Sequence, residues 1–153
     1  HGYDVHRLVE GRDLILGGVS VPFARGLLGH SDADVLAHAV MDALLGAAAL
    51  GDIGGMFPDS DERWRGADSL HLLERVAARL AEHGWAVGNV DATVIAQAPR
   101  LAAYLPEMRR RLAAAMGVNA EQVSVKATTE ERLGFTGAGE GIACHAVALI
   151  EKT

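Results

Sequence analysis

The chain has a single cysteine among its 153 residues, so it can form no internal disulfide. Cys144 lies in an apolar run and is expected to be a small core residue, and the lone thiol fits a reducing, cytoplasmic location. Positive charge is also scarce, because 14 lysines and arginines face 20 acidic residues and leave a net charge of -6. Such a chain is not expected to bind nucleic acid. An anionic ligand would have to meet metal ions, backbone N–H groups or a few placed cations.

Long hydrophobic runs, internal repeats and linkers are missing as well, and no segment resembles a secretory leader, so none is expected. No apolar run approaches the length of a membrane-spanning helix, so no membrane partner is expected. No G-x-x-x-x-G-K sequence exists, which excludes a P-loop, and the glycines of 137–141 lead into a strand, which excludes a dinucleotide fingerprint. With 50% hydrophobic and 22% charged residues, the composition predicts one globular domain over residues 1–153.

Residues 29–61 carry the densest pattern in the chain. Apolar residues recur at helical spacing over 35–48 and predict a helix with one apolar stripe. Ser31, with Asp34 three residues later, predicts the N-cap, and Gly51 is expected to end the helix. The start of this helix, with His30, could also bind an anion through its unpaired N–H groups, although an ordinary cap explains the same residues.

A histidine and two carboxylates follow one another along this helix. Asp34, His38 and Asp42 recur every four residues and lie on one face, where burial without partners would be costly. Near the N-terminus, Asp4 and His6 share one face of a short strand. With His38 they would supply the three ligands of a catalytic zinc site that keeps one position open. A surface pair and a hydrogen-bonded histidine are the ordinary alternatives, and spacing alone leaves both open.

The remaining pattern predicts an α/β fold, an α+β sandwich in which helices pack on one face of a mixed β-sheet. The closing strand is apolar on both faces and is expected to be central. Two polar segments, 52–69 and 128–141, read as loops that suit ribose hydroxyls, phosphate oxygens or Mg²⁺, or as plain solvated turns. His71, His83 and His145 are expected to be surface or structural residues. Strands are predicted at 1–6, 14–16, 19–21, 89–97, 123–127 and 142–150, and further helices at 68–84 and 106–117.

Taken together, these segments resemble the 2-C-methyl-D-erythritol 2,4-cyclodiphosphate synthase family of the non-mevalonate isoprenoid pathway. The matching segments span nearly the whole chain in order and are GYDVH, GGVSVPFARGLLGHSDADVLAHAVMDALLGAAALGDIGGMFPDSD, GNVDATVIAQAPR and VKATTEERLGFTGAGEGIACHAVALI. The resemblance implies a homotrimer with active sites between subunits and a small-molecule cytidine diphosphate substrate.

The resemblance also implies the metals and the catalytic residues. Asp4, His6 and His38 correspond to the zinc ligands, with one Zn²⁺ per subunit. Glu131 corresponds to the residue that holds Mg²⁺ or Mn²⁺ at the diphosphate. His30 and Thr129 correspond to the groups that stabilise the transition state. The implied substrate-binding set is Asp4, Val5, His6, His30, Ser31, Asp52, Ile53, Gly54, Phe57, Pro58, Asp59, Ser60, Asp61, Ala96, Gln97, Ala98, Pro99, Arg100, Leu101, Ala102, Thr128, Thr129, Glu130, Glu131 and Phe135.

The implied reaction is a phosphorus–oxygen lyase reaction that cyclises 4-diphosphocytidyl-2-C-methyl-D-erythritol 2-phosphate and releases CMP. Two other functions stay open, a zinc-dependent phosphohydrolase and a non-catalytic trimeric cytidine-nucleotide-binding protein. The chain departs from many family members at Ala138, where they carry an arginine that faces the central cavity of the trimer. Tight binding of an isoprenoid diphosphate in that cavity is therefore not expected here. Arg100 stands where lysine is common.

Overall fold

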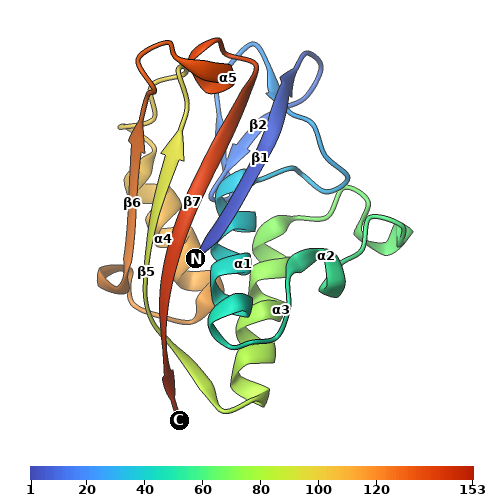
Figure 1. Cartoon of the computed structure of the whole chain (residues 1–153), viewed down its shortest axis with the longest axis vertical. Helices are drawn as coiled ribbons and strands as arrows, with labels where there is room; N and C mark the ends of the chain where they lie inside the picture. The colour runs from blue at the N-terminus through green and yellow to red at the C-terminus, as the bar shows by residue number, and fades with distance from the viewer.

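A five-stranded mixed sheet runs through the molecule in the order β4-β1-β7-β5-β6 (Figure 1). The computed structural model describes residues 1–153. β5 and β6 pair in parallel, and the other neighbours pair antiparallel, so the predicted mixed sheet is confirmed. The strands are β1 (Gly2–Val9), β4 (Gly26–Leu27), β5 (Trp85–Ile95), β6 (Val123–Thr128) and β7 (Gly141–Lys152), and β2 (Leu14–Leu16) and β3 (Val19–Val21) form a separate hairpin.

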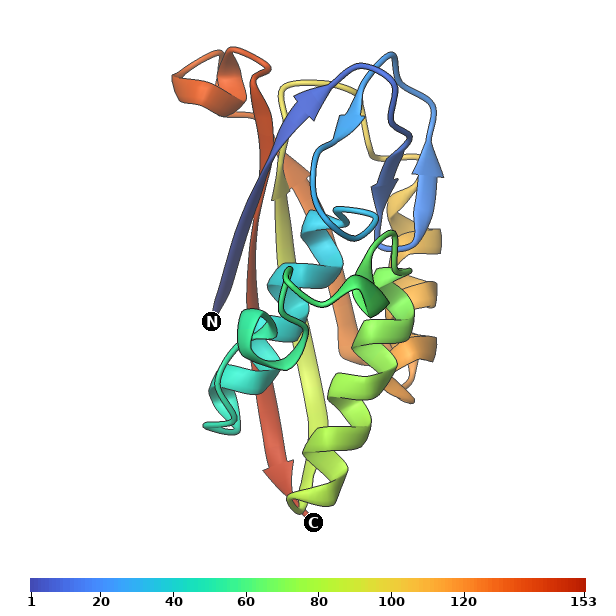
Figure 2. The same ribbon diagram turned by 90° about the vertical axis from the view of Figure 1, so that its right-hand side faces the viewer.

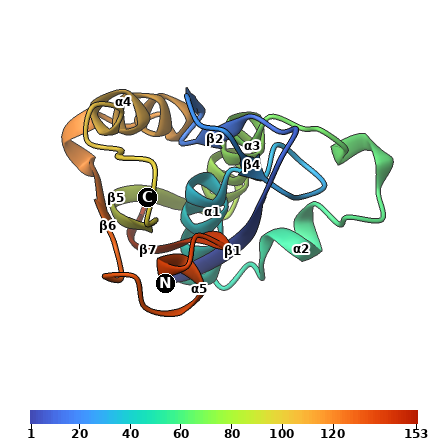
Figure 3. The same ribbon diagram turned by 90° about the horizontal axis from the view of Figure 1, so that it is seen from above.

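Three long helices cover the same face of the sheet, as predicted: α1 (Val35–Ala47), α3 (Ser69–Glu82) and α4 (Leu105–Met116). Figures 2 and 3 show them on one side of β1 and β7, with α1 between the sheet and α3. A cluster of 36 buried apolar residues fills the space between these layers. None of the helices is both long and apolar enough to cross a membrane.

The backbone of β1 approaches α1 closely at Gly2. A Cβ atom at this position would collide with the main chain of α1 at Ala39 and Ala43. Only glycine therefore allows the strand to lie this near to the helix. The close approach brings the next inward-facing side chains of β1 within reach of α1.

The opposite face of the sheet is open in the single chain. β7 is the central strand, as its apolar sequence predicts, but Val147 and Leu149 are 57% and 58% exposed. Tyr3 and Val5 of the neighbouring β1 are 44% and 41% exposed on the same face. Helices on one side alone leave these outward side chains uncovered. Cys144 points the other way and is fully buried, as expected for a core residue.

The central helix begins later than its sequence pattern suggests. The prediction of Ser31 as N-cap is wrong, because Asp34 is the N-cap and its carboxylate accepts the Ala37 N–H at 3.0 Å. Ser31 Oγ accepts the Ala33 N–H instead. Residues 30–32 therefore precede the helix, and the Asp34 carboxylate already accepts the Ala37 N–H of its first turn, so an anion near His30 would not be bound by the free helix start.

The same helix ends earlier than predicted. Its last residue is Ala47 and its C-cap is Ala48, not Gly51. Ala49 has a φ of 56°, so the chain has left the helix two residues before the glycine. The predicted caps Asp68 of α3 and Gly117 of α4 are confirmed. The two predicted loops also contain short helices: α2 (Ile53–Met56), η1 (Glu62–Trp64) and α5 (Gly134–Gly137). A further turn, η2 (Ala120–Gln122), precedes β6.

Candidate active site

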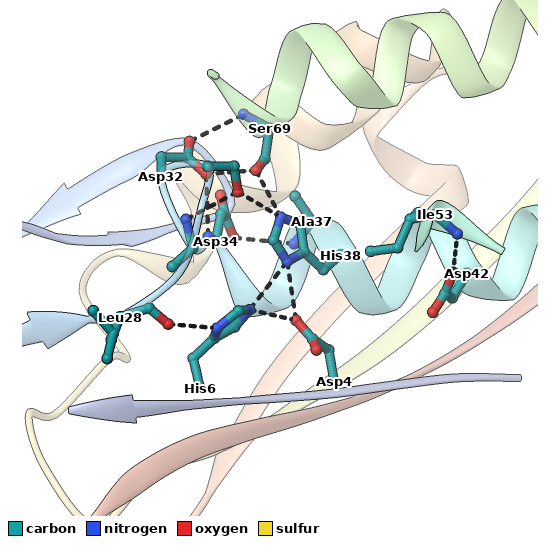
Figure 4. A network of polar contacts seen from close by, with 12 residues as sticks. Asp4, His6, Leu28, Asp32, Asp34, Ala37, His38, Asp42, Ile53 and Ser69 are labelled. Atoms are coloured by element: carbon teal, nitrogen blue, oxygen red, sulfur yellow. Dashed lines mark hydrogen bonds and ion pairs between the residues drawn. The ribbon is translucent and has the colours of Figure 1, made fainter. Parts of the chain in front are cut away.

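Three side chains from β1 and α1 converge on one point beside the sheet (Figure 4). Asp4 and His6 alternate with exposed residues of β1 and face α1, which contributes His38. Asp4 Oδ2 lies 2.9 Å from His6 Nε2 and 3.0 Å from His38 Nδ1. The two ring nitrogens are 3.2 Å apart. The predicted grouping of Asp4, His6 and His38 is therefore present, with its donor atoms at mutual contact.

The hydrogen bonds behind the two rings fix which nitrogens carry protons. His6 Nδ1–H donates to the Leu28 carbonyl at 2.8 Å, which leaves a lone pair on Nε2. The Ser69 hydroxyl donates to Asp32 Oδ1 at 2.5 Å, so its oxygen accepts from His38 Nε2–H at 3.0 Å. In the neutral form of the ring, His38 Nδ1 then carries a lone pair as well. Neutral imidazoles therefore turn an unprotonated nitrogen toward Asp4, as metal ligands must, whereas protons on these nitrogens give hydrogen bonds to the Asp4 carboxylate.

This donor set fits a divalent metal ion. Three lone-pair-bearing atoms facing one point repel one another unless a proton or a metal cation lies between them. Ligands of a tetrahedral zinc, about 2.0–2.1 Å from the ion, are about 3.3 Å apart, close to the separations here. No other group of three or more His, Cys, Asp or Glu side chains in the chain has this geometry.

The same cluster shifts two pKa values. Burial alone would raise the pKa of Asp4, but hydrogen bonds from His38 and His6 outweigh it and lower that pKa to about 2. Burial opposes a charge on His6, yet the Asp4 carboxylate raises the pKa of His6 above its ordinary value. Asp4 is therefore an anion over the working pH range, as a metal ligand must be.

The two other carboxylates of α1 have structural partners. Asp34 is fully buried and accepts N–H groups of Gly17 and Gly18 at 2.9 and 2.8 Å, besides its own helix. Burial and the charge of Asp32 raise the pKa of Asp34 to about 6. Asp42 accepts the Ile53 N–H at 2.8 Å and so anchors the start of α2. The expectation that these carboxylates need partners is confirmed, and the partners are backbone amides.

A cavity of about 400 Å³ opens over the three-donor cluster. We call it the cluster cavity. Its lining includes several predicted substrate contacts, His30, Ser31, Ile53, Gly54, Phe57 and Asp59. It also has an apolar wall that the sequence reasoning missed, built by Met41, Trp64 and Leu72. Phe57 and Trp64 meet edge to face with ring centroids 5.1 Å apart. No local sequence pattern predicts this contact.

A second cavity, of about 270 Å³, gathers another group of the residues predicted to bind substrate. We call it the 96–102 cavity. The Arg132 N–H donates to Gln97 Oε1 at 3.1 Å and ties the 129–132 loop to this cavity. Leu105 and Ala127 complete the wall and were not predicted. The predicted members are Ala96, Gln97, Pro99, Arg100, Leu101, Ala102, Thr128 and Thr129.

The two cavities share no lining residue, so a single chain does not bring Thr129 together with His38. Val5 points to the open sheet face, and only its backbone could meet a ligand at the cluster. His71 is exposed on α3, His83 is exposed at the C-cap of α3, and His145 is exposed on β7, as expected. The predicted site residues that line neither cavity are Val5, Asp52, Pro58, Ser60, Asp61, Ala98, Glu130, Glu131 and Phe135.

Ser69 and Asp32 support the cluster from behind, and the sequence reasoning gave neither of them this role. We expect Ser69→Ala to weaken metal binding roughly 10–100-fold, because His38 Nε2–H loses its nearer acceptor and keeps only Ser31 Oγ, at 3.2 Å, to hold its tautomer and orientation. Titration against a coloured chelator measures this affinity. Ser20→Ala, which removes an exposed hydroxyl from β3, is the matched control. Equal affinity in both variants would show that Ser69 does not orient His38.

Comparison with known proteins places these features in context. A model of the YgbB family matches residues 1–151. A 2-C-methyl-D-erythritol 2,4-cyclodiphosphate synthase from Pelotomaculum thermopropionicum is 63% identical over 152 residues, which cover 99% of this chain and 94% of that protein.

Solved structures give the same picture. A structure of 2C-methyl-D-erythritol-2,4-cyclodiphosphate synthase in a CDP-bound form is 35% identical, with a TM-score of 0.89, over 98% of this chain and 97% of that one. The bifunctional IspDF from Campylobacter jejuni is 41% identical, with a TM-score of 0.96. The match covers 99% of this chain but 41% of that longer protein.

Proposed function

The chain belongs to the YgbB family, and we propose that it catalyses the reaction of the 2-C-methyl-D-erythritol 2,4-cyclodiphosphate synthases. The substrate is 4-diphosphocytidyl-2-C-methyl-D-erythritol 2-phosphate, and the products are the 2,4-cyclodiphosphate and CMP. The observation that carries this proposal is the cluster of Asp4, His6 and His38 at the base of a cavity that also contains His30. We take residues 1–153 as one domain that works in the cytoplasm.

The reaction joins two ends of one molecule. An oxygen of the 2-phosphate forms a bond to the β-phosphorus, and the bond from that phosphorus to the bridging oxygen of CMP breaks. Because nucleophile and electrophile are already tethered, the protein has to fold the substrate for in-line attack and balance its charge. His30 is proposed to contact the reacting phosphate from the wall of the cluster cavity, and Thr129 to meet it from the 96–102 cavity.

The metal ions are part of this proposal. Asp4, His6 and His38 would hold one Zn²⁺ per chain, which supplies positive charge for the phosphate oxygens. Glu131 is exposed at the strand-end loop and would hold Mg²⁺ or Mn²⁺ together with the substrate diphosphate. A single carboxylate suits Mg²⁺, because this ion keeps several waters and takes substrate phosphates as ligands.

We further propose a homotrimer with each active site between two subunits. Two observations support it: the cluster cavity and the 96–102 cavity share no residue, and the outward apolar face of β1 and β7 lacks cover. Burying that face between copies would remove exposed apolar side chains from water. The 96–102 cavity of one subunit would then complete the cluster cavity of the next.

Phosphorus NMR of the protein with substrate, Zn²⁺ and Mg²⁺ tests the reaction. A cyclic diphosphate and CMP should appear together and in equal amounts. In oxygen-18 water the products should carry no label, because the attacking oxygen belongs to the substrate. A labelled phosphate product would indicate the zinc-dependent phosphohydrolase instead. Binding of a cytidine nucleotide without any turnover would indicate the non-catalytic alternative.

A further inference from the structure

The guanidinium of Arg12 holds the segment that carries His30 by hydrogen bonds to two backbone carbonyls of that segment. Its Nη1 donates to the Gly29 carbonyl at 3.1 Å and its Nη2 to the Ser31 carbonyl at 2.9 Å. These two carbonyls flank His30 on either side. Arg12 is half-buried, and none of the ion pairs of the chain includes it. An arginine in an acidic protein that binds two carbonyls and no carboxylate indicates a positional role.

Two further backbone groups beside Arg12's partners are hydrogen-bonded as well. The His30 carbonyl accepts the Gly66 N–H at 2.8 Å, and the Asp32 N–H donates to the Ala67 carbonyl at 3.1 Å. The carbonyls of residues 29, 30 and 31 are thus all hydrogen-bonded from outside the segment. The ring of His30 has one hydrogen bond, to the Asp61 carbonyl at 3.3 Å. The position of the ring therefore depends mainly on its own backbone, which Arg12 helps to hold.

Arg12 is itself anchored to the edge of the sheet. Gly26 of β4 lies so close that a Cβ atom there would collide with the carbonyls of Arg12 and Asp13. β4 in turn pairs with β1 through Leu8 and Leu27. The backbone of Arg12 packs against the sheet at β4, and its guanidinium binds the His30 segment. The result is a short, stiff connection between the strand of the metal cluster and His30.

We propose that Arg12 is a positioning residue for the cyclisation, which acts through His30 and does not contact the substrate. This inference rests on the proposed function of His30. The planar guanidinium can reach two carbonyls at once, whereas the ammonium of a lysine is a point donor and would hold one end of the segment less firmly. A displacement of about 1 Å at a catalytic group costs roughly 100-fold in rate. Loss of the grip should lower turnover and leave substrate binding largely intact.

The kinetic test uses Arg12→Ala and Arg12→Lys in the metal-loaded protein. We expect kcat to fall about 10–100-fold in the alanine variant and less in the lysine variant, with KM and bound zinc unchanged. Arg65→Ala is the matched control. Arg65 lines, together with Arg12, a third cavity of about 450 Å³, but it pairs with the exposed Glu62. A normal kcat in Arg12→Ala, or a loss of zinc with it, would overturn the proposal.

A double-mutant cycle separates an effect through His30 from an independent one. If Arg12 acts through His30, adding Arg12→Ala to His30→Ala should cost little further activity. Losses that multiply would show that Arg12 acts by another route and would refute the inference.

A readout without turnover keeps the test separate from the proposed function. In protein with isotope-labelled histidines, Arg12→Lys should shift the ring signals of His30 and leave those of His71 and His83 in place. Unchanged His30 signals would contradict the proposal that Arg12 positions the His30 ring. If the unmodified protein formed no cyclic product, the proposed function would fail, while this spectrum would still decide whether Arg12 positions His30.

Discussion

Replacing His38 with alanine is expected to abolish stoichiometric metal binding and with it turnover. Asp4 and His6 alone would keep two of the three donor atoms, and metal affinity should fall by more than roughly 100-fold, since even supporting residues are worth about 10–100-fold. The metal contributes several kcal/mol of charge stabilisation in such reactions, so kcat should drop on the order of 1000-fold. The fold should survive, because alanine favours the helix and His38 faces the cluster cavity.

The matched control is His83→Ala at the end of α3. His83 is exposed, and its Nδ1 bonds the Arg79 carbonyl, far in the chain from the cluster. Elemental analysis of the purified proteins should give about one zinc per chain in the control and in the unmodified protein, on the three-ligand count. Stoichiometric zinc in His38→Ala, with the thermal unfolding midpoint unchanged, would mean that the ligand assignment is wrong.

The sequence predicted those parts of the fold and site that depend on short-range patterns. Alternation along β1 placed Asp4 and His6 on one face, and helical spacing placed His38 on α1. No rule of spacing connects a strand at one end of the chain with a helix more than thirty residues later. The expectation that these three residues meet therefore depended on the family resemblance. The convergence itself depends on close packing of β1 on α1 at Gly2.

Where prediction from the sequence failed, contacts between distant segments were responsible. Ser31 and Asp34 both suit a helix cap, but only Asp34 also satisfies the amides of Gly17 and Gly18 in the β2–β3 turn. Those bonds span 16 and 17 residues. They fix the cap one turn later than the local capping pattern suggests.

The residues that support the three-donor cluster were missed for the same reason. Ser69 reads locally as the first residue of a helix after its Asp68 cap, and Asp32 as part of a helix start. Their hydrogen bond joins residues 37 apart and orients His38 from behind. Trp64 lies in a segment that reads as a polar loop, yet it forms part of the wall of the cluster cavity. Side-chain partners of this kind follow from the assembled fold and not from any periodicity.

Mixing two inactive variants should restore activity if the active site lies between subunits. His38→Ala damages the cluster cavity, and Thr129→Ala damages the 96–102 cavity. In trimers assembled at random from equal amounts, about a quarter of the sites would combine an intact cluster cavity from one subunit with an intact 96–102 cavity from the next. The mixture should therefore regain up to about a quarter of the unmodified turnover, far above either variant alone.

The control for this mixing experiment is a pair of variants that cannot restore each other's activity. His38→Ala mixed with His6→Ala damages the same cavity in every chain, so no site becomes whole and no activity should return. Subunits are exchanged by unfolding and refolding the two proteins together, and differently tagged chains identify mixed trimers by two-step purification. Light scattering on the eluting peak should correspond to three chains. Full activity in a protein that elutes as a single chain would rule out the shared site, as would verified mixed trimers of His38→Ala and Thr129→Ala that stay inactive. Recovery in that mixture alone is the result expected when the two cavities of each site come from different copies of the chain.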